Sequence, residues 1–210
     1  MATSVYRKIR EAILSGRFPP EHLLGENALA SEFNISRTPV REALHRLEIE
    51  RLVERTARGM IVRATSPEEI LDIYDVRITL EGAAAHHAAL RATELDRIRL
   101  RSAQDAMAKA DADVGRRQST NRDFHAALWH ASHSATLLDL LERLNTHLIR
   151  YSSTTLTDNE RWEAALGEHE ELLAAIEAQD PEKAQRLAIR HMKGARDVRL
   201  RMYAEGQGSG

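Results

Sequence analysis

The stretch from Glu26 to Leu47, ENALASEFNISRTPVREALHRL, has the pattern of two short helices joined by a tight turn. Asn34 lies between the two helices and tolerates the left-handed conformation that a sharp turn needs. Ser36 is a candidate N-cap for the second helix. Apolar residues of that helix recur at i, i+3, i+4 and i+7, so they share one buried face. They are Val40, Ala43, Leu44 and Leu47. The pattern predicts a helix-turn-helix unit.

The opposite face of the second helix carries Arg37, Arg41 and His45 at i, i+4 and i+8, with Thr38 beside them. A guanidinium can bind O6 and N7 of guanine with two hydrogen bonds, so arginines at the start of such a helix are suited to the major groove of DNA. A solvated helix face would show the same charged stripe, and this stretch alone leaves both interpretations open.

The flanking residues indicate a winged helix-turn-helix over residues 1–65. Its further expected elements are a helix over about Ser4–Ser15, an extended piece at Leu23–Leu24, and strands over Leu52–Arg55 and Met60–Val62. The turn between the strands contains Gly59, which can adopt positive φ. Arg58 at the tip of this wing could enter the minor groove. It could equally be an ordinary exposed turn residue.

Charge is distributed unevenly along the chain. Residues 1–65 contain eleven Arg and Lys against eight Asp and Glu, a net charge of +3, whereas the remainder carries −5. A basic front on an acidic body suggests that any contact with phosphate is confined to the front.

The 210 residues suffice for one domain of moderate size or two small ones. Cysteine is absent from the sequence, which excludes a disulfide framework and a thiolate metal site. No apolar run approaches the ~18 residues of a membrane span, and the N-terminus lacks a secretion signal. We therefore expect a cytoplasmic protein with no membrane partner.

Residues 66–205 are expected to form a second, all-α domain. Ser66-Pro67-Glu68-Glu69 has the pattern of a capping box with Pro at its first helical position, so the linker is short. Thr93 and Asp180 are candidate caps, and Gly115 marks a break. The expected helices cover residues 67–90, 94–112, 119–132, 134–152, 157–178 and 181–203. The sequence thus predicts a mainly α protein, a winged helix-turn-helix followed by a bundle of about six helices.

The N-terminal motifs resemble the DNA-binding domain of the GntR family of bacterial transcription regulators. The segments that carry the resemblance are Leu23-Leu24-Gly25-Glu26, Leu29-Ala30, Ile35-Ser36-Arg37-Thr38-Pro39-Val40-Arg41-Glu42-Ala43-Leu44 and Leu52-Val53. It implies that Arg37, Thr38 and Arg41 contact operator DNA, with the wing around Arg58 and Gly59 assisting. The family often has glycine where this chain has Glu21 and Arg51. Both departures lie at turns, so they bear on local backbone geometry rather than on DNA binding.

Four residues of the second domain are candidate metal ligands by position. Asn121 and His125 are i, i+4 on one expected helix, so they share a face. His169 and His191 lie on successive helices, and antiparallel packing could bring their imidazoles to one level. A mid-helix histidine is more often a core or surface residue, and the spacing does not decide between these interpretations.

The C-terminal domain resembles the FCD ligand-binding domain of the FadR subfamily. The resemblance rests on Asn121-Arg122-Asp123-Phe124-His125 with Leu128, on Glu168-His169 with Ala175-Ile176 and Asp180, and on His191. It implies a divalent metal held by Asn121, His125, His169 and His191. Many relatives have Asp at the first of these positions, and a neutral amide is a weaker donor. Three imidazoles favour zinc or nickel, and octahedral coordination would leave positions for water or an anion.

Arg77 resembles the family's arginine that helps to hold the carboxylate of an effector. The alternative is an ion pair with Glu81 at i, i+4 on the same helix. The remaining histidines of this region match no ligand position and are expected on helix surfaces. They are His86, His87, His130 and His133.

These observations predict a homodimeric transcriptional regulator, a repressor, whose affinity for double-stranded operator DNA changes when a small organic acid binds near the metal. A dimer is expected because paired recognition helices read palindromic half-sites. A metal-responsive regulator, in which the ion itself is the signal, is an alternative.

A metal-dependent enzyme is a third interpretation, because an ion with open positions can also activate water. The segment from His169 to Leu173 lacks the second histidine of a zincin helix, and no Gly-x-Ser-x-Gly elbow appears. No general base is evident beside the candidate ligands. We therefore expect that the chain is not an enzyme.

Overall fold

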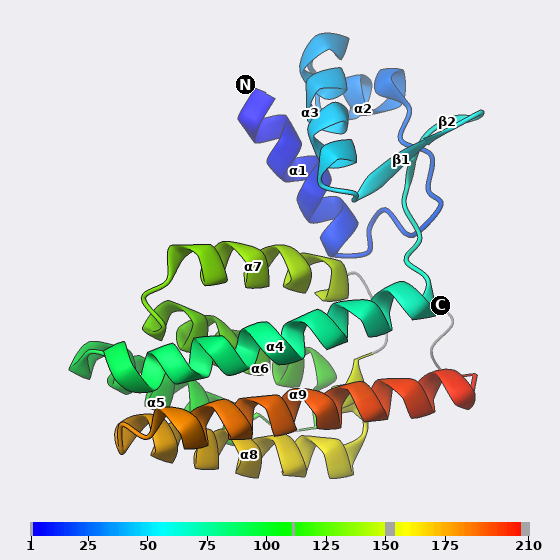
Figure 1. Ribbon diagram of the computed structural model, residues 1–210. Helices are drawn as coiled ribbons and strands as arrows, with labels where there is room; N and C mark the ends of the chain where they lie inside the picture. The colour runs from blue at the N-terminus through cyan, green and yellow to red at the C-terminus, as the bar shows by residue number, and fades with distance from the viewer. Residues whose placement is uncertain (1, 111, 150–153, 207–210) are drawn as a thin grey trace. The chain divides into compact units, whose positions relative to one another are not determined.

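The computed structural model describes residues 2–110, 112–149 and 154–206 (Figure 1). The elements of these ranges, in chain order, are α1 (Ala2–Leu14), α2 (Glu26–Glu32), α3 (Arg37–Ile49), β1 (Val53–Thr56), β2 (Gly59–Val62), α4 (Pro67–Arg91), α5 (Glu94–Ala108), α6 (Val114–Ala131), α7 (Ala135–Ile149), the 3-10 helix η1 (Thr155–Thr157), α8 (Asn159–Glu177) and α9 (Pro181–Ala204). The predicted fold class, a winged helix-turn-helix followed by an all-α bundle, is confirmed.

Two compact units share these elements, and the division falls after Ser66. Helices α1 to α3 and the hairpin form the first unit, together with the end of α7 from Thr146 onward. The rest of the helical region, beginning with α4 at Pro67, forms the second. Each unit has an apolar core of its own.

The core of the first unit is built around the inward face of α3. The four apolar residues predicted for this face are all buried there. They pack in one cluster with side chains of α1 and of the segment after α3, among them Ile9, Ile13 and Leu52. Burial of aliphatic side chains of this size stabilises the unit by about 1.5–3 kcal/mol each.

The wing is an antiparallel hairpin in which Val53 pairs with Val62. The extended piece predicted before α2 is present, because Leu23 forms an antiparallel bridge with Ile61. Gly59 begins β2 with φ 124°, a conformation that residues with a Cβ rarely adopt. The two-stranded hairpin and the bridge at Leu23 thus bring three short extended segments together beside the helix-turn-helix.

Left-handed residues end α2 and α3, and one of them is the Asn34 predicted for the turn, with φ 52°. After α3, Arg51 has φ 56°, its N–H donates to the carbonyl of Glu48, and the N–H of Leu52 donates to the carbonyl of Leu47. These two bonds form a Schellman motif, which satisfies carbonyls left free at a helix end.

The two departures from the family's glycines, at Glu21 and Arg51, keep the backbone conformation that glycine favours. Glu21 has φ 66° and Arg51 has φ 56°. For residues with a Cβ this conformation costs roughly 1–2 kcal/mol. The turns therefore retain their geometry, and the side chains carry a local conformational cost.

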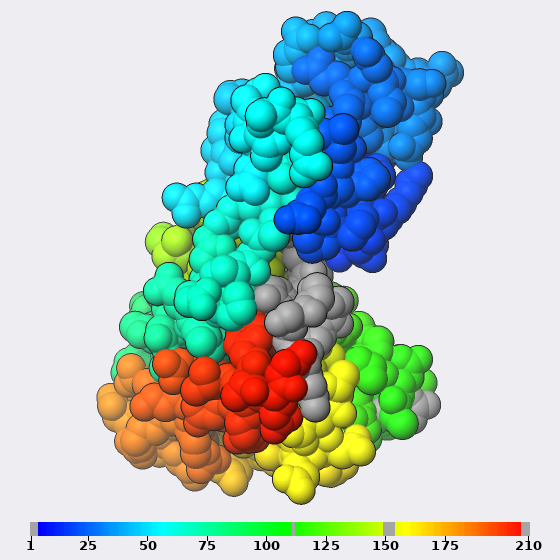
Figure 2. All heavy atoms as spheres, turned by 90° about the vertical axis from the view of Figure 1, so that its right-hand side faces the viewer, coloured from blue at the N-terminus to red at the C-terminus, as the bar shows by residue number. Residues whose placement is uncertain are grey.

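The second unit packs its long helices around a core that is rich in alanine on α4. Four alanines of this helix are fully buried: Ala84, Ala85, Ala88 and Ala89. A Cβ added to Gly82 would lie 2.8 Å from Cγ1 of Ile189, so glycine permits α4 to approach α9 this closely. Helices α8 and α9 lie side by side (Figures 1 and 2).

Aspartate caps set several helix boundaries of the second unit. The prediction of a helix from residue 119 is wrong at its start, because α6 begins at Val114 after Asp113, whose side chain accepts from the N–H of Arg116. Gly115 therefore lies inside a first turn. The expected caps Thr93 and Asp180 are both present, and Thr93 forms a capping box with Asp96.

The other boundaries differ by a few residues. Helix α5 ends at Ala108 rather than at 112, and α8 begins at Asn159, after the short η1. The last residues of the helix expected over 134–152 lie outside the described ranges. Among the described helices, none combines the length and the apolar character needed to cross a membrane.

Candidate nucleic-acid interface and metal centre

The outer face of α3 presents the residues predicted to contact DNA. The side chains of Arg37, Arg41 and His45 are 59%, 65% and 71% exposed, and Thr38 is exposed beside them. The backbone at Ser36 has the extended conformation of an N-cap, but its side chain makes no capping hydrogen bond. The start of α3 therefore lacks the side-chain cap that the sequence suggests, although its polar residues are exposed.

The two arginines of this face share one carboxylate. Arg41 donates from Nε and NH2 to the two carboxylate oxygens of Glu26, at 3.0 and 2.8 Å. Arg37 donates from NH2 to Oε2 of the same residue at 3.3 Å. Glu26 is the first residue of α2, so this contact links the two helices of the helix-turn-helix. No sequence pattern predicts this contact.

Arg58 and Gly59 occupy the hairpin turn as predicted. Arg58 is exposed, and its backbone N–H donates to the hydroxyl of Thr56 at 3.2 Å. The side chain of Arg58 thus stands at the tip of the wing.

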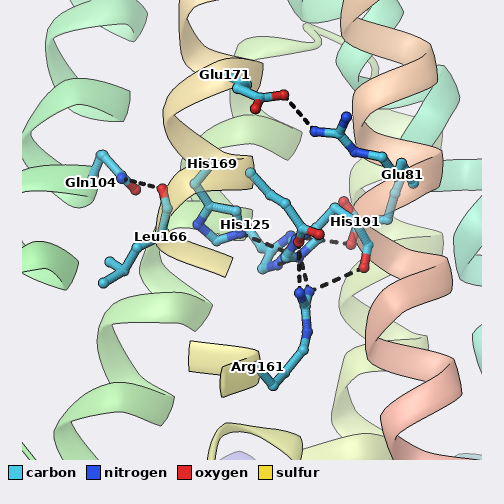
Figure 3. A network of polar contacts seen from close by, with 10 residues as sticks. Glu81, Gln104, His125, Arg161, Leu166, His169, Glu171 and His191 are labelled. Carbon is cyan, nitrogen blue, oxygen red and sulfur yellow. Dashed lines mark hydrogen bonds and ion pairs between the residues drawn. The ribbon is translucent and has the colours of Figure 1, made fainter. Parts of the chain in front are cut away.

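Three of the four candidate metal ligands converge in the interior of the second unit (Figure 3). His125 of α6, His169 of α8 and His191 of α9 are buried, and their ligand nitrogens lie within 4.8 Å of one another. Nε2 of His191 lies 3.2 Å from Nε2 of His169 and 3.3 Å from Nε2 of His125. Two nitrogens bound to one zinc ion in tetrahedral geometry would be about 3.3 Å apart. The arrangement therefore has the dimensions of a metal site.

Two glutamates orient the imidazoles of this cluster. Nδ1 of His191 lies 2.7 Å from Oε2 of Glu168, and Nδ1 of His125 lies 3.4 Å from Oε1 of Glu81. An ionised carboxylate only accepts hydrogen bonds, so the contact with Glu168 favours a proton on Nδ1 of His191 and a lone pair on its Nε2. The contact between His125 and Glu81 is longer, and Nδ1 of His125 has no hydrogen-bond partner among the described residues. Such outer carboxylates are the usual partners of metal-binding histidines.

Arg161 also contacts His191 and competes for the same ring nitrogen. Its NH2 lies 3.1 Å from Nδ1 of His191, and it donates to the backbone carbonyl of His191 at 3.2 Å. Its NH1 donates to Glu168 at 2.7 Å. Nδ1 of His191 can accept from Arg161 only without a proton, and it can donate to Glu168 only with one. Because the contact with Glu168 is shorter, we assign the proton to Nδ1 and the hydrogen bond to Glu168.

The electrostatic environment keeps the imidazoles of His169 and His191 neutral. Burial lowers the pKa of His169 well below its ordinary value, and the neighbouring imidazoles and Arg161 lower it further. Burial likewise lowers the pKa of His191, with His125 and Arg161 contributing. A neutral imidazole is the form that binds a metal.

Asn121 lies one turn before His125 on α6, so both residues face the same side of the helix. Its Oδ1 is buried, and it has no hydrogen-bond partner among the described residues. Leaving a buried acceptor unpaired costs about 1–3 kcal/mol. A cation would satisfy this oxygen, which is consistent with its predicted place in the ligand set.

Arg77 is buried and makes the ion pair considered as the alternative to an effector contact. Its NH2 lies 2.5 Å from Oε1 of Glu81, and Nε1 of Trp129 donates to Oε2 of the same carboxylate at 2.8 Å. Burial opposes ionisation of Glu81, but its interactions with His125 and Arg77 outweigh the burial and lower the pKa of Glu81. The carboxylate therefore stays charged and links Arg77 to His125.

Sequence reasoning missed several residues of the centre: Glu81 as a partner of His125, Arg161, Glu168, and Phe124, whose ring stacks on His169 with centroids 3.9 Å apart. Arg161 and Glu168 are i, i+7 on α8, a spacing that places them on one face of the helix with opposite charges. That spacing could have identified the pair. No local sequence pattern indicates that the side chain of Glu168 turns toward His191 of α9.

The other histidines lie apart from the cluster. His130 and His133 are exposed, whereas His86 and His87 are half-buried. Nε2 of His133 lies 2.8 Å from Oδ2 of Asp96, which belongs to the cap of α5.

Two family models match the chain. The gntR family of bacterial regulatory proteins matches residues 1–62, and the FCD domain matches residues 72–194. The chain is 30% identical over 198 residues to the HTH-type transcriptional repressor GlaR of Escherichia coli, covering 89% of this chain and 90% of the repressor. It is 28% identical over 193 residues to the uncharacterized HTH-type transcriptional regulator YdhC of Bacillus subtilis, covering 89% and 85% of the two chains. The solved structure of McbR/YncC from E. coli shares the fold, with a TM-score of 0.78, 23% identity, and coverage of 96% of this chain and 98% of that chain.

Proposed function

Because the chain belongs to the gntR family of bacterial regulatory proteins and carries an FCD domain, we propose that it is a repressor controlled by a small organic acid bound at a metal ion in its helical unit. It is a DNA-binding transcriptional regulator and not an enzyme. The metal, the acid and the homodimer are parts of the proposal.

One observation carries the metal site: three buried imidazoles converge, with Nε2 of His191 3.2 Å from Nε2 of His169 and 3.3 Å from Nε2 of His125. Glu168 favours a proton on Nδ1 of His191, which leaves its Nε2 lone pair directed at the other two imidazoles. A cation among the three rings would bind such lone pairs at separations that match those of nitrogen ligands on one zinc ion. Three imidazoles and the amide oxygen of Asn121 suit zinc or nickel.

The charge of the centre supports a carboxylate as effector. Arg77 pairs with Glu81, and Arg161 pairs with Glu168, so the four charges of these side chains compensate one another. Burial keeps His169 and His191 neutral. A divalent cation would therefore bring a buried charge of +2 without a counter-ion, and a buried charge is costly unless it is paired. An organic acid that takes an open coordination position would compensate it, and Arg77 is linked to the centre through Glu81, which also contacts His125.

The acid can act only through a difference in affinity. If it binds more tightly to the conformation with weak operator affinity, it shifts the population toward that conformation by linkage. A homodimer presents two copies of α3 to the two halves of a palindromic operator. If the metal alone produced the shift, the ion would be the signal.

The DNA-binding half of the proposal is tested on α3. Arg41→Ala should weaken operator binding by roughly 1–3 kcal/mol, and Arg190→Ala, which removes an exposed arginine of the helical unit, is the matched control. Binding is measured by fluorescence anisotropy with a duplex selected by the protein from a randomised library. The affinity of the unaltered protein should fall steeply with salt. Equal affinities of the two variants would remove Arg41 from DNA recognition.

The metal half is tested on the cluster. His169→Ala should lower the metal content measured by elemental analysis, whereas His130→Ala should leave it unchanged. Thermal-shift screening with organic acids then compares the metal-loaded and chelated protein. Stabilisation by an acid only in the loaded state supports the proposed effector site. Unaltered metal content in His169→Ala would exclude the ligand assignment, and a DNA response to metal without any acid would favour the ion as signal.

A further inference from the structure

Glu26 stands where the two helices of the helix-turn-helix meet. It opens α2 directly after the N-cap Gly25, and its side chain is 29% exposed. A carboxylate in the first turn of a helix is stabilised by the N-terminal end of the helix dipole. The carboxylate thus belongs to the first turn of α2 and contacts arginines on the outer face of α3.

The contact with Arg41 uses only one edge of the guanidinium. Nε and NH2 of Arg41 bind the two oxygens of Glu26, and NH1 has no partner among the described residues. A guanidinium has five N–H donors, and this side-on pair occupies two of them. The edge formed by NH1 and NH2 keeps three donors, enough for two parallel hydrogen bonds to O6 and N7 of guanine.

We propose that Glu26 is a positioning residue for base recognition, which holds the guanidinium of Arg41 side-on and leaves its other edge for guanine. The inference rests on the proposed role of α3 in reading the operator. Arg37 is held less closely by the same carboxylate, at 3.3 Å, so the effect acts mainly through Arg41.

The carboxylate of Glu26 increases the preference of the outer face of α3 for the operator over unrelated DNA in two ways. It restricts the rotamers of Arg41 before DNA arrives, so less side-chain freedom is lost when the base contact forms. It also places a negative charge beside the arginines, which disfavours contact with phosphate on unrelated sequences. Hydrogen bonds from Arg41 lower the pKa of Glu26 to about 2, so this charge is present at neutral pH.

Removing the charge should therefore have opposite effects on the two kinds of DNA. Glu26→Gln should weaken binding to the duplex selected by the unaltered protein about tenfold, because Arg41 loses its bidentate partner. The same variant should bind a scrambled duplex about twofold to threefold more tightly, because one negative charge is lost near the phosphates. Both affinities are measured by anisotropy at one salt concentration.

Glu32→Gln is the matched control. Glu32 is the last residue of α2 and forms an ion pair with Arg17, so the variant removes the same charge from the same helix without touching α3. It should strengthen binding to both duplexes slightly or leave both unchanged. If Glu26→Gln strengthens binding to both duplexes, the carboxylate merely repels DNA and the inference is wrong. If it weakens both equally, its role is structural and the inference is also wrong.

A double-mutant cycle shows whether Glu26 acts through Arg41. In an Arg41→Ala background, Glu26→Gln should no longer weaken binding to the selected duplex. A loss that persists in this background would overturn the inference while leaving the role of Arg41 intact. If Arg41→Ala itself has no effect on the selected duplex, the proposed base contact fails instead. The two failures are thus distinguishable.

Discussion

Glu168→Gln should weaken metal binding although Glu168 is not itself a ligand of the proposed site. Its carboxylate accepts the Nδ1 proton of His191 at 2.7 Å and thereby directs the Nε2 lone pair toward the other two imidazoles. A glutamine can turn its NH2 group toward Nδ1, which then accepts a hydrogen bond and transfers the ring proton to Nε2. In that tautomer the nitrogen that faces the cluster is blocked.

The magnitude follows from two contacts of the carboxylate. Loss of an outer hydrogen bond to a metal-binding histidine typically lowers metal affinity 10- to 100-fold, or about 1.4–2.7 kcal/mol. Glu168 also accepts from NH1 of Arg161, a buried cation whose other polar contacts among the described residues are with His191. The metal-free protein should therefore also lose stability, by about 1–3 kcal/mol.

Two separate measurements distinguish these effects. Competition with a chelating indicator gives the zinc affinity of the folded protein, and thermal unfolding in excess chelator gives the stability of the metal-free form. Glu171→Gln is the control, because Glu171 lies on the same helix, is exposed, and pairs with Arg190 alone among the residues that the structure describes. A variant with reduced stability but unchanged zinc affinity would show that Glu168 serves Arg161 alone, and the assignment of the His191 tautomer would be refuted.

Three further predictions concern single side chains. Asp96→Asn should destabilise the protein by about 1–2 kcal/mol at pH 7; burial of Asp96 opposes ionisation, but hydrogen bonds from Thr93 and His133 outweigh it and lower its pKa to about 2. The difference in unfolding free energy between the variant and the unaltered protein should therefore be complete above pH ~4 and disappear as the pH falls toward 2. Urea titrations across this range measure it, and a constant difference would contradict the prediction. Arg51→Gly should raise the unfolding free energy by about 0.5–1 kcal/mol, because glycine adopts φ 56° without steric cost. The greater entropy of glycine in the unfolded chain removes only part of this gain. A lower unfolding temperature would show that the arginine side chain stabilises the protein by more than its backbone strain costs. Asn121→Asp should tighten zinc binding in the same competition assay, because a carboxylate replaces a neutral donor, and an unchanged affinity would place Asn121 outside the ligand set.

The sequence predicted most of the fold because its signals are local. The spacing of Val40, Ala43, Leu44 and Leu47 places them on one helix face, and the structure buries all four. The left-handed turn at Asn34 is equally local. The boundaries are less accurate where an aspartate caps a helix, as at Asp113, because glycine at position 115 suggests a break although a capped first turn can include it.

The candidate centre was predictable only in part, for a physical reason. The histidines could be selected by the family resemblance, and the structure brings three of them together. Their partners Glu81 and Glu168 depend on which way long side chains turn between α4, α6, α8 and α9, and no spacing along one helix encodes that choice. The same is true of Glu26, which meets Arg41 only because the turn after α2 brings the two helices together.

The hydrogen bond between Trp129 and Glu81 makes Trp129 an intrinsic fluorescent probe of the candidate metal centre. Trp129 is one of two tryptophans in the chain, its indole donates to the carboxylate that contacts His125, and its ring centroid lies 6.2 Å from that of His125. The other, Trp162, is buried in a separate apolar cluster. In a Trp162→Phe background, emission from Trp129 would report the charge state of the centre, and quenching by nickel would follow the loading of each molecule without any added dye.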